Sequence, residues 1–315
     1  MGSYLVTGGA GFIGSHLARS LLADGHEVVV ADNLSTGLVS NIPEGAQFVE
    51  CDLARPDSMG LLPDAAFDGV IHLAAQSSGY IGQKDPYADM QANVGSTMLL
   101  GQWCLKKGVK RFLYASSMTV YGRQAAAPLD EEAPCIPISH YGVSKLASEN
   151  YLRVMAGDGL SPTSLRLYNV YGPGQNLGNI YQGMVSIYLA YLLRGELLPV
   201  TGSFARYRDF VYIADVVSAF RAVLDMDTTP SLAYNVGTGI KTTVEGVIVA
   251  LMRGLQLPSD YPVEEQSGTA SDLFGSVADT SRISRELGWR WETGLDDGLA
   301  QMIAWAKQQM GVHPN

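Results

Sequence analysis

Short apolar runs alternate with longer amphipathic segments along the first half of the chain. Residues 4–7 and 27–31 are short and apolar, as buried strands are, and the segment between them repeats apolar residues at helical spacing. The unbroken apolar run 69–75 is typical of a parallel strand that is covered on both faces. Further strands are predicted at 46–49, 111–116 and 164–168, and helices at about 86–107 and 141–156. This alternation predicts an α/β fold, a Rossmann-type doubly wound parallel sheet.

The pattern changes after residue 168, where glycine and proline interrupt the chain more often. We interpret residues 1–168 as the principal domain and residues 169–315 mainly as a smaller C-terminal lobe that binds substrate. A strand and a helix at about 209–237 are expected to return to the principal domain. A last helix, at about 295–310, has apolar residues along one face and should pack against the body of the molecule.

The composition of the chain is ordinary for a globular enzyme and argues against several other classes. With 315 residues, of which 47% are hydrophobic and 17% charged, the chain can bury a sizeable core. A net charge of −10 argues against nucleic acid or an anionic membrane as the main partner. The three cysteines are widely spaced, so we expect neither disulfides nor a metal site, and we expect a cytoplasmic location. No apolar run approaches the ~18 residues that span a bilayer, and the early first strand leaves no room for a signal peptide.

A glycine-rich turn joins the first predicted strand to the first helix. Gly8, Gly11 and Gly14 are spaced so that a tight turn brings a diphosphate close to the amides at the helix N-terminus. The second strand ends in Asp32, whose carboxylate can accept both hydroxyls of an adenosine ribose and would repel a 2′-phosphate. Together these features predict an NAD site rather than an NADP site. A turn that only packs the helix on the strand is the alternative.

Other predicted strands end in residues suited to the same edge of the sheet. Asp52 follows the third strand, where its carboxylate could meet an adenine edge. Ala74 and Ala75 are small enough for a cofactor to pass close over the end of their strand. The strand at 111–116 delivers Ser116 and Ser117 to the carboxyl edge, where ligands of doubly wound sheets bind.

Tyr141 and Lys145 stand four residues apart on a predicted helix, which puts a phenol and an ammonium on one face. A phenol ionises near pH ~10, but an adjacent positive charge can lower that pKa by roughly one to three units. The pair is therefore a candidate general base for a hydroxyl group. Two surface side chains on an amphipathic helix are the alternative. We interpret His72, inside an apolar run, as a hydrogen-bonded core histidine, and His140 as a surface residue at the start of a helix.

Taken in order, these motifs resemble those of the extended short-chain dehydrogenase/reductase family. The shared set is Thr7-Gly8-x-x-Gly11-x-x-Gly14, Asp32, Asp52-Leu53, Leu73-Ala74-Ala75, Ser116-Ser117, Tyr141-x-x-x-Lys145 and Asn169, and it extends over nearly the whole chain. Within the family the sequence is most similar to the sugar-nucleotide 4-epimerases. That similarity lies in Asp32-Asn33-Leu34-Ser35, Val120-Tyr121-Gly122, Tyr171-Gly172-Pro173-Gly174-Gln175 and Arg208-Asp209-Phe210-Val211.

The resemblance implies a tightly held NAD and a 4-keto sugar intermediate. Tyr141 would remove the proton of the sugar 4-hydroxyl while C4 passes a hydride to the nicotinamide, and the hydride would return on the other face of the sugar. Lys145 would lower the pKa of Tyr141 and hold the nicotinamide ribose, and Ser117 would hydrogen-bond the reacting oxygen. The implied cofactor contacts are Gly8, Gly11, Phe12, Ile13, Gly14, Asp32, Asn33, Asp52, Leu53, Leu73, Ala74, Ala75, Asn93, Ser116, Tyr141, Lys145 and Tyr168.

The resemblance also implies substrate contacts, in which Asn169 would touch the diphosphate and Arg208 would neutralise it. Upstream of Asp272 the family usually has a second diphosphate arginine, where this chain has Gly268-Thr269-Ala270, so the nucleotide stays open and Arg206 is a candidate replacement. The position that limits the sugar C2 group is Ser276 rather than a bulky tyrosine, so N-acetylated sugars are expected to fit as well as plain ones. The implied substrate contacts are Ser117, Asn169, Gln182, Met184, Arg208, Asp272 and Ser276.

Two positions separate an epimerase from a dehydratase. The 4,6-dehydratases of the family follow the residue at Ser117 with an acid and a base, Asp-Glu, whereas this chain has Met118 and Thr119, which cannot do that chemistry. The resemblance therefore implies a 4-epimerase of a UDP-hexose or UDP-N-acetylhexosamine, and a homodimer through the helices at 86–107 and 141–156. A net oxidoreductase with the same three residues and a non-catalytic NAD-binding protein are the alternatives.

Overall fold

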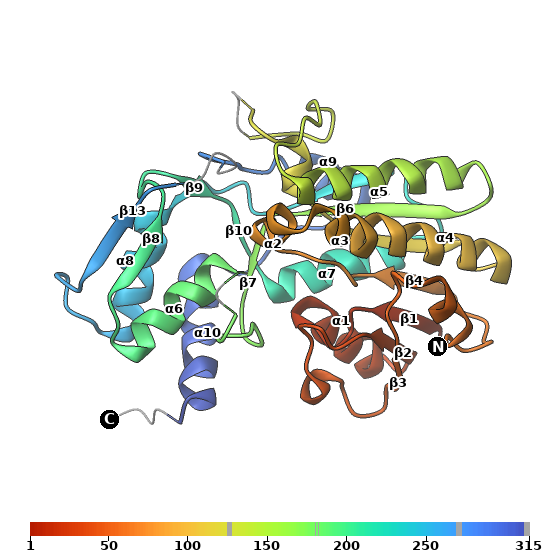
Figure 1. Ribbon diagram of the computed structural model, residues 1–315, viewed down its shortest axis with the longest axis horizontal. Helices are drawn as coiled ribbons and strands as arrows, with labels where there is room; N and C mark the ends of the chain where they lie inside the picture. Colours follow the sequence, from red (N-terminus) through yellow and green to blue (C-terminus); the bar gives the residue numbers. More distant parts are fainter. Residues whose placement is uncertain (125–127, 180, 182, 269–272, 312–315) are drawn as a thin grey trace.

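A seven-stranded parallel sheet forms the larger part of the molecule (Figure 1). The computed structural model describes residues 1–124, 128–179, 181, 183–268 and 273–311. The strands of the main sheet are β1 (Ser3–Thr7), β2 (Glu27–Asp32), β3 (Gln47–Glu50), β4 (Gly69–His72), β5 (Arg111–Ser117), β6 (Ser161–Leu167) and β11 (Ala233–Val236). They follow the order β11-β6-β5-β4-β1-β2-β3, and each neighbouring pair is parallel. The strand order reverses between β1 and β4, where a doubly wound sheet opens a crevice for ligands.

Helices cover both faces of this sheet because successive residues of a strand point to opposite sides. The helices are α1 (Phe12–Ala23), α3 (Pro86–Met90), α4 (Ser96–Lys107), α5 (His140–Ala156) and α7 (Ile213–Leu224). Val6 of β1 belongs to a core cluster with Leu17 of α1 and Val216 of α7, whereas Leu5 belongs to a cluster with Leu100 of α4. The two apolar layers confirm the predicted Rossmann-type doubly wound sheet.

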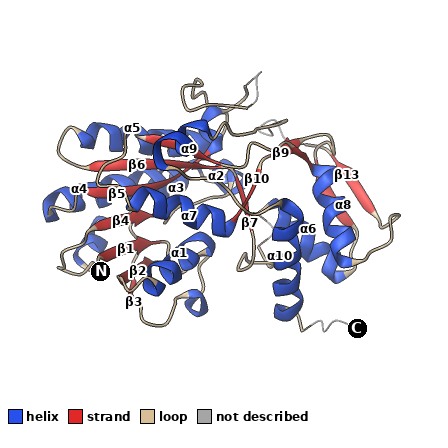
Figure 2. Cartoon of the chain, turned by 180° about the vertical axis from the view of Figure 1, so that it is seen from behind, coloured by secondary structure: helices blue, strands red, loops and turns tan. Residues whose placement is uncertain are grey.

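A smaller lobe lies beside the main sheet (Figures 1 and 2). It contains α6 (Met184–Arg194), β8 (Leu198–Thr201), α8 (Val244–Leu255), β13 (Val263–Gln266) and α10 (Leu295–Gln309). Short strand pairs join the segments: β8 with β13, β7 (Asn169–Tyr171) with β10 (Phe210–Tyr212), and β9 (Tyr207–Arg208) with β12 (Thr242–Thr243). Helix α10 buries the apolar face that the sequence predicts, with Leu299, Met302, Ile303 and Ala306. No helix among the described residues has the length and apolar character that crossing a membrane requires.

Three elements differ from the sequence prediction. Strand β4 ends at His72 rather than at residue 75, because the next amides turn towards Thr7, whose hydroxyl accepts the Ala74 N–H (3.2 Å). The helix predicted at 86–107 is interrupted by a π-helical turn, Gln91–Gly95, between α3 and α4. Strand β10 pairs with β7 instead of entering the main sheet, whereas α7 and β11 do lie on it.

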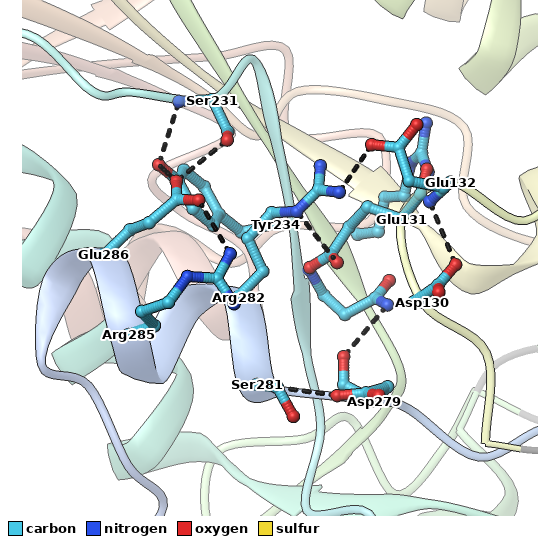
Figure 3. Close-up of polar contacts among 12 residues, drawn as sticks. Asp130, Glu131, Glu132, Ser231, Tyr234, Asp279, Ser281, Arg282, Arg285 and Glu286 are labelled. Carbon is cyan, nitrogen blue, oxygen red and sulfur yellow. Dashed lines mark hydrogen bonds and ion pairs between the residues drawn. The ribbon is translucent and has the colours of Figure 1, made fainter.

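A polar network joins residues 130–132, β11 and α9 (Ser281–Leu287) (Figure 3). Arg282 forms ion pairs with Glu131 (Nε to Oε2, 3.3 Å) and with Glu132. Glu131 also accepts the backbone N–H of Asn235 (2.7 Å), and the Asn235 side chain accepts the Tyr121 hydroxyl (2.7 Å). The segment that follows β5 is thus held against β11 by bonds to charged groups, which are stronger than neutral ones.

Candidate active site

A cleft of ≈ 1320 Å³ opens at the carboxyl edge of the main sheet, with residues of both lobes on its wall. Its wall brings together residues that are more than 150 positions apart along the chain, from Gly8 to Met184. The sequence-predicted residues on this wall are Gly8, Gly11, Phe12, Ile13, Gly14, Asp32, Asn33, Asp52, Leu53, Leu73, Ala74, Ala75, Ser116, Ser117, Tyr141, Lys145, Tyr168, Asn169 and Met184.

The glycine turn after β1 leaves no room for side chains. A Cβ atom at Gly8, whose φ is +68°, would lie 2.6 Å from the Ala74 nitrogen, and one at Gly14 would lie 2.2 Å from the Gly8 carbonyl oxygen. Helix α1 starts after Gly11 without a side-chain cap, so its first amides stay available at the cleft wall. Free amides at the positive end of a helix suit an anionic group such as a dinucleotide diphosphate.

Asp32 is fixed at the end of β2 and is only 7% exposed. Its carboxylate accepts the Ala10 N–H (3.0 Å) and the Leu34 N–H (2.8 Å), one on each oxygen. Each oxygen keeps a further lone pair for a ribose hydroxyl. Leu34 has a φ of +56°, a conformation that costs a non-glycine residue about 1 kcal/mol or more, so the turn holds Asp32 at the expense of strain. The wall residues at 33–41 include no basic side chain, although Arg19 of α1, also on the wall, donates to the Asn41 carbonyl (2.9 Å).

Ser117 and Tyr141 meet at the end of β5. The Ser117 oxygen accepts two hydrogen bonds from Thr119, one from the backbone N–H (3.2 Å) and one from the hydroxyl (3.0 Å). Its own proton is therefore directed to Tyr141, and this hydrogen bond lowers the pKa of the phenol. Burial has the larger effect and raises the pKa of Tyr141 to about 12.

The electrostatic part of the sequence prediction for this pair is wrong in this structure. Lys145 lies one helical turn beyond Tyr141, but its Nζ is 5.7 Å from the centre of the phenol ring and donates to the Ala115 carbonyl (2.9 Å). Burial lowers the pKa of Lys145 to about 8, against the opposite effect of Asp89 and Glu149. The ammonium therefore does not offset the desolvation of the phenol, and the pKa of Tyr141 rises rather than falls.

Two predicted cofactor contacts, Ser116 and Asn93, are hydrogen-bonded to side chains of α5. The Ser116 hydroxyl, although at the wall, donates to Glu149, whose carboxylate is paired with Arg166 (2.7 Å). Asn93 is buried behind the wall in the π-helical turn, and its amide donates to Ser144 (2.9 Å). Both residues therefore act on the position of α5 rather than on a ligand in this structure.

Two predicted diphosphate arginines also lie away from the described cleft wall. Arg208 is buried and donates to the Tyr207 carbonyl (2.8 Å), and Arg206 donates to the Ser203 carbonyl (3.2 Å). Ser276 is buried beside the Tyr168 hydroxyl. Gln182 and Asp272 lie outside the described residues.

Two buried amide oxygens of the cleft wall have no hydrogen-bond partner among the described residues: Oδ1 of Asn169 and Oε1 of Gln175. A buried acceptor without a donor costs about 1–3 kcal/mol, so this part of the wall is suited to a ligand that donates hydrogen bonds. Asn169 was predicted from its motif, whereas Gln175 was noted only as part of a glycine-proline segment.

A loop over the cleft was not assigned a role from the sequence. Helix α2 (Gly79–Lys84) carries Tyr80, whose ring stacks on that of Tyr181 with centroids 5.2 Å apart, and the Ser78 hydroxyl donates to the Tyr181 carbonyl (2.9 Å). Behind the loop, Gln76 donates to the buried carboxylate of Asp89 (2.8 Å). Neither contact has a local sequence signal, because each joins residues that are far apart along the chain or on different elements.

The two histidines have the structural roles that the sequence predicts. His72 is 1% exposed and bonds to the Thr7 hydroxyl (2.7 Å), and His140 is exposed at the start of α5. Within the described part of the chain, no group of three or more His, Cys, Asp or Glu side chains is arranged to hold a metal ion.

Comparison with known proteins agrees with this geometry. The profile of the NAD dependent epimerase/dehydratase family matches residues 4–237. The chain belongs to this family. It follows that the resemblance stated from the motifs and the prediction of NAD as cofactor are confirmed.

Individual relatives cover almost the whole chain. A UDP-glucose 4-epimerase of Mycolicibacterium smegmatis is 35% identical over 95% of this chain and 96% of its own length. The crystal structure of a Thermotoga maritima UDP-glucose 4-epimerase with UDP-glucose has a TM-score of 0.93 and 34% identity, and the match covers 98% of this chain and 99% of that one. A UDP-N-acetylglucosamine 4-epimerase from Methanobrevibacter ruminantium M1, in complex with UDP-N-acetylmuramic acid, has a TM-score of 0.90 and 28% identity over 98% of this chain and 99% of that one.

Proposed function

We propose that this enzyme is a nucleotide-sugar 4-epimerase, which inverts the hydroxyl group at C4 of the sugar through a transient 4-keto sugar. The observation that carries the proposal is that Ser117, Tyr141 and Lys145 share one cleft with the glycine turn and with Asp32. A proton acceptor for a hydroxyl group and a cradle for NAD therefore face the same space.

In this mechanism Tyr141 accepts the proton of the sugar 4-hydroxyl and gives it back at the end of the reaction. When bound, NAD⁺ would accept the hydride of C4, return it, and bring a second positive charge towards the phenol. With substrate bound, Ser117 would donate its proton to the reacting oxygen instead of to Tyr141, and the two hydrogen bonds from Thr119 fix the position of the Ser117 oxygen. Lys145, with a pKa of about 8, is mostly an ammonium at neutral pH and stabilises negative charge on the phenol oxygen.

The remaining site residues are proposed to divide between cofactor and substrate. The diphosphate of NAD would meet the amides after Gly11, and its adenosine ribose would meet Asp32. On the other lobe, Asn169 and Met184 would contact the nucleotide sugar, and the Asn169 oxygen would accept one of its hydroxyl groups. Arg208, with Arg206 as a candidate replacement for the second arginine, is proposed to neutralise the diphosphate, because a bond to a carbonyl uses only part of the five N–H donors of a guanidinium.

The substrate is proposed to be a UDP-hexose or a UDP-N-acetylhexosamine. Support comes from relatives whose names specify UDP-glucose and UDP-N-acetylglucosamine. Dehydration is not proposed, because Met118 is buried and the Thr119 hydroxyl is bonded to Ser117. Ser276 leaves more room than a tyrosine would, so Ser276→Tyr should reduce turnover of the N-acetylated sugar more than that of the plain sugar, and equal losses on both would refute this. Because Ser276 is buried, the thermal midpoint of the variant is measured alongside.

The enzyme is further proposed to be a cytoplasmic homodimer. Tyr87 on α3, and Tyr151 and Val154 on α5, are large apolar side chains that are exposed by 66%, 43% and 67%. All three cysteines are unpaired, as in a reducing compartment. Val154→Glu should convert a dimer to a monomer in light scattering, and a wild-type monomer would refute the proposed assembly. We also propose that residues 1–168 with about 209–237 form the NAD-binding domain and that 169–315 form mainly the substrate lobe.

The protein as purified tests the central proposal. A 4-epimerase should retain NAD and interconvert UDP-glucose and UDP-galactose, or the corresponding N-acetylated pair, without added cofactor. A net oxidoreductase would instead need one NAD⁺ for each substrate and release NADH. Tyr141→Phe should retain NAD and lose turnover by roughly 10²- to 10⁴-fold. A near-normal rate for this variant would refute the assignment of the base.

A further inference from the structure

Asp89 is a carboxylate enclosed by the protein directly behind the catalytic helix. It lies on α3, next to the π-helical turn, and is 1% exposed. One oxygen accepts the Ser144 hydroxyl (2.7 Å) and the other accepts the Gln76 amide (2.8 Å). The Asn93 amide nitrogen lies 3.3 Å from each oxygen. An asparagine in place of Asp89 would put a donor where one of these acceptors stands, so the hydrogen bond at that end would have to change.

The two oxygens of the Asp89 carboxylate bond to residues in two different parts of the active site. Ser144 lies between Tyr141 and Lys145 in α5, so its bond to Asp89 restrains the turn that carries both side chains. Gln76 lies on the cleft wall, at the start of the loop that contains α2. Asp89 therefore connects the catalytic helix with the loop over the cleft, although it does not line the cleft itself.

The charge of Asp89 acts on the same pair of residues. Its hydrogen-bond partners are neutral, and a buried charge with neutral partners costs several kcal/mol unless a cation compensates. Asp89 raises the pKa of both Lys145 and Tyr141, as a negative charge does. The charges of Asp89 and Lys145 thus act on each other without a direct ion pair among the described residues, since the Lys145 ammonium donates to the Ala115 carbonyl (2.9 Å).

Other groups face Lys145 from the elements packed around it. Glu149, one turn further along α5, also raises the pKa of Lys145, but its carboxylate is paired with Arg166 (2.7 Å). The Tyr114 ring of β5 lies 4.8 Å from Nζ, and its phenol is neutral because burial raises its pKa. The imidazole of His72 in β4 is neutral, because burial lowers its pKa to about 3. Unlike Glu149, Asp89 has only neutral hydrogen-bond partners in the described part of the chain: Gln76, Asn93 and Ser144.

We propose that Asp89 is a positioning residue of the reaction, which holds Tyr141 and Lys145 through Ser144 and aligns the Gln76 amide on the cleft wall. Asp89 touches neither substrate nor cofactor in this proposal. Its effect on the rate rests on the proposed epimerase function, whereas its effect on Lys145 does not.

The sign of the effect on the pH profile follows from the charges. The active form, a Tyr141 phenolate beside a Lys145 ammonium, is a minor one, because the pKa of about 12 for Tyr141 lies above that of about 8 for Lys145. Its population gives a bell-shaped rate profile whose rising limb lies at the lower and whose falling limb lies at the higher of these two apparent pKa values. Asp89 disfavours the phenolate and favours the ammonium, so it raises both apparent pKa values. Removing its charge should move both limbs of the bell to lower pH, by about one unit. A residue that only stabilises the fold would lower the rate without moving the limbs.

Three variants separate the effect of the Asp89 charge, the effect of its hydrogen bond to Ser144, and the nonspecific effect of a substitution on α3. Asp89→Asn removes the charge and should shift both limbs to lower pH, with a maximal kcat reduced on the order of ten-fold. Ser144→Ala keeps the charge but removes the link to α5, so kcat should fall several-fold while the limbs stay in place. Asp85→Asn is the matched control: Asp85 is the exposed N-cap of α3, and asparagine caps a helix as well as aspartate does. This control should keep the wild-type rate and profile.

The pKa of Lys145 can be measured in the absence of substrate. NMR of the ¹⁵N-labelled lysine side chains, with Lys145→Met to assign the signal, should give a lower pKa for Lys145 in Asp89→Asn than in the wild type and in Asp85→Asn. Unchanged Lys145 titration together with unmoved limbs would overturn the proposal, and so would a normal kcat in Ser144→Ala. If Asp89→Asn does not fold, as judged by circular dichroism, Ser144→Ala still decides the positioning. A wild type without epimerase activity would refute the proposed function but leave the titration as the test of Asp89.

Discussion

His72 makes the free energy of unfolding depend on pH in a way that can be worked out from its contacts. The side chain is 1% exposed and lies between the hydroxyls of Thr7 (2.7 Å from Nδ1) and Ser96 (3.3 Å from Nε2). The Thr7 oxygen already accepts the N–H groups of Leu73 and Ala74, so its proton goes to Nδ1. The imidazole is therefore neutral, with its proton on Nε2. Burial, with a smaller contribution from Lys145, lowers its pKa from 6.5 to about 3.

The size of the effect follows from these two pKa values. Above pH 6.5 the histidine is neutral in both the folded and the unfolded chain, and the full stability is present. Below 6.5 the unfolded chain binds a proton that the folded protein does not bind until about pH 3, so stability is lost as the pH falls through this window. Because pH 5 lies about 1.5 pH units below the pKa of the histidine in the unfolded chain, protonation there stabilises the unfolded state by about 2 kcal/mol relative to the folded state.

Urea titrations at pH 7 and pH 5 measure this loss. His72→Gln removes the titrating group, so the variant should be less stable at pH 7 but should lose about 2 kcal/mol less than the wild type between the two pH values. His140→Gln, at an exposed position, is the control and should lose as much as the wild type. If His72→Gln and the wild type lost the same free energy between pH 7 and pH 5, the reasoning on the buried neutral imidazole would be refuted.

Three further substitutions test the glycine turn as the NAD site, the orientation of Ser117 by Thr119, and the contribution of the buried Asp209 carboxylate to stability. Gly14→Ala should abolish the retention of NAD during purification, measured as absorbance of released cofactor, because its Cβ would lie 2.2 Å from the Gly8 carbonyl oxygen. Thr119→Val keeps the backbone donor to Ser117 but removes the hydroxyl donor (3.0 Å), so kcat should fall about ten-fold with little change in KM, and an unchanged kcat would contradict the orienting role. Asp209→Ala should lower the free energy of unfolding by about 3 kcal/mol or more in urea, because the buried carboxylate accepts three backbone N–H groups and a hydroxyl; a loss below about 1 kcal/mol would contradict this.

The features that the sequence determined by itself are those with short-range geometry. A strand, a glycine turn and a helix place Gly8 and Gly14 against each other whatever the rest of the chain does, and Asp32 follows as the end of the next strand. Four residues make one helical turn, so Tyr141 and Lys145 had to share a face. Alternation of apolar strands with helices was likewise enough to predict a doubly wound sheet.

Only the tertiary structure decided the electrostatics and the supporting contacts of the site. The desolvation of Tyr141 and Lys145 depends on what packs around them, and it moved the pKa of the phenol in the opposite direction to the one that their spacing predicted. Asp89 and Gln76 gain their roles from contacts between elements that no periodicity reveals. Arg208 matched a motif and Arg206 was a candidate replacement for a missing arginine, but only the structure showed that each donates to a nearby carbonyl. Short-range geometry follows from the spacing of residues along the chain, whereas burial and long-range hydrogen bonds arise only when distant segments pack together.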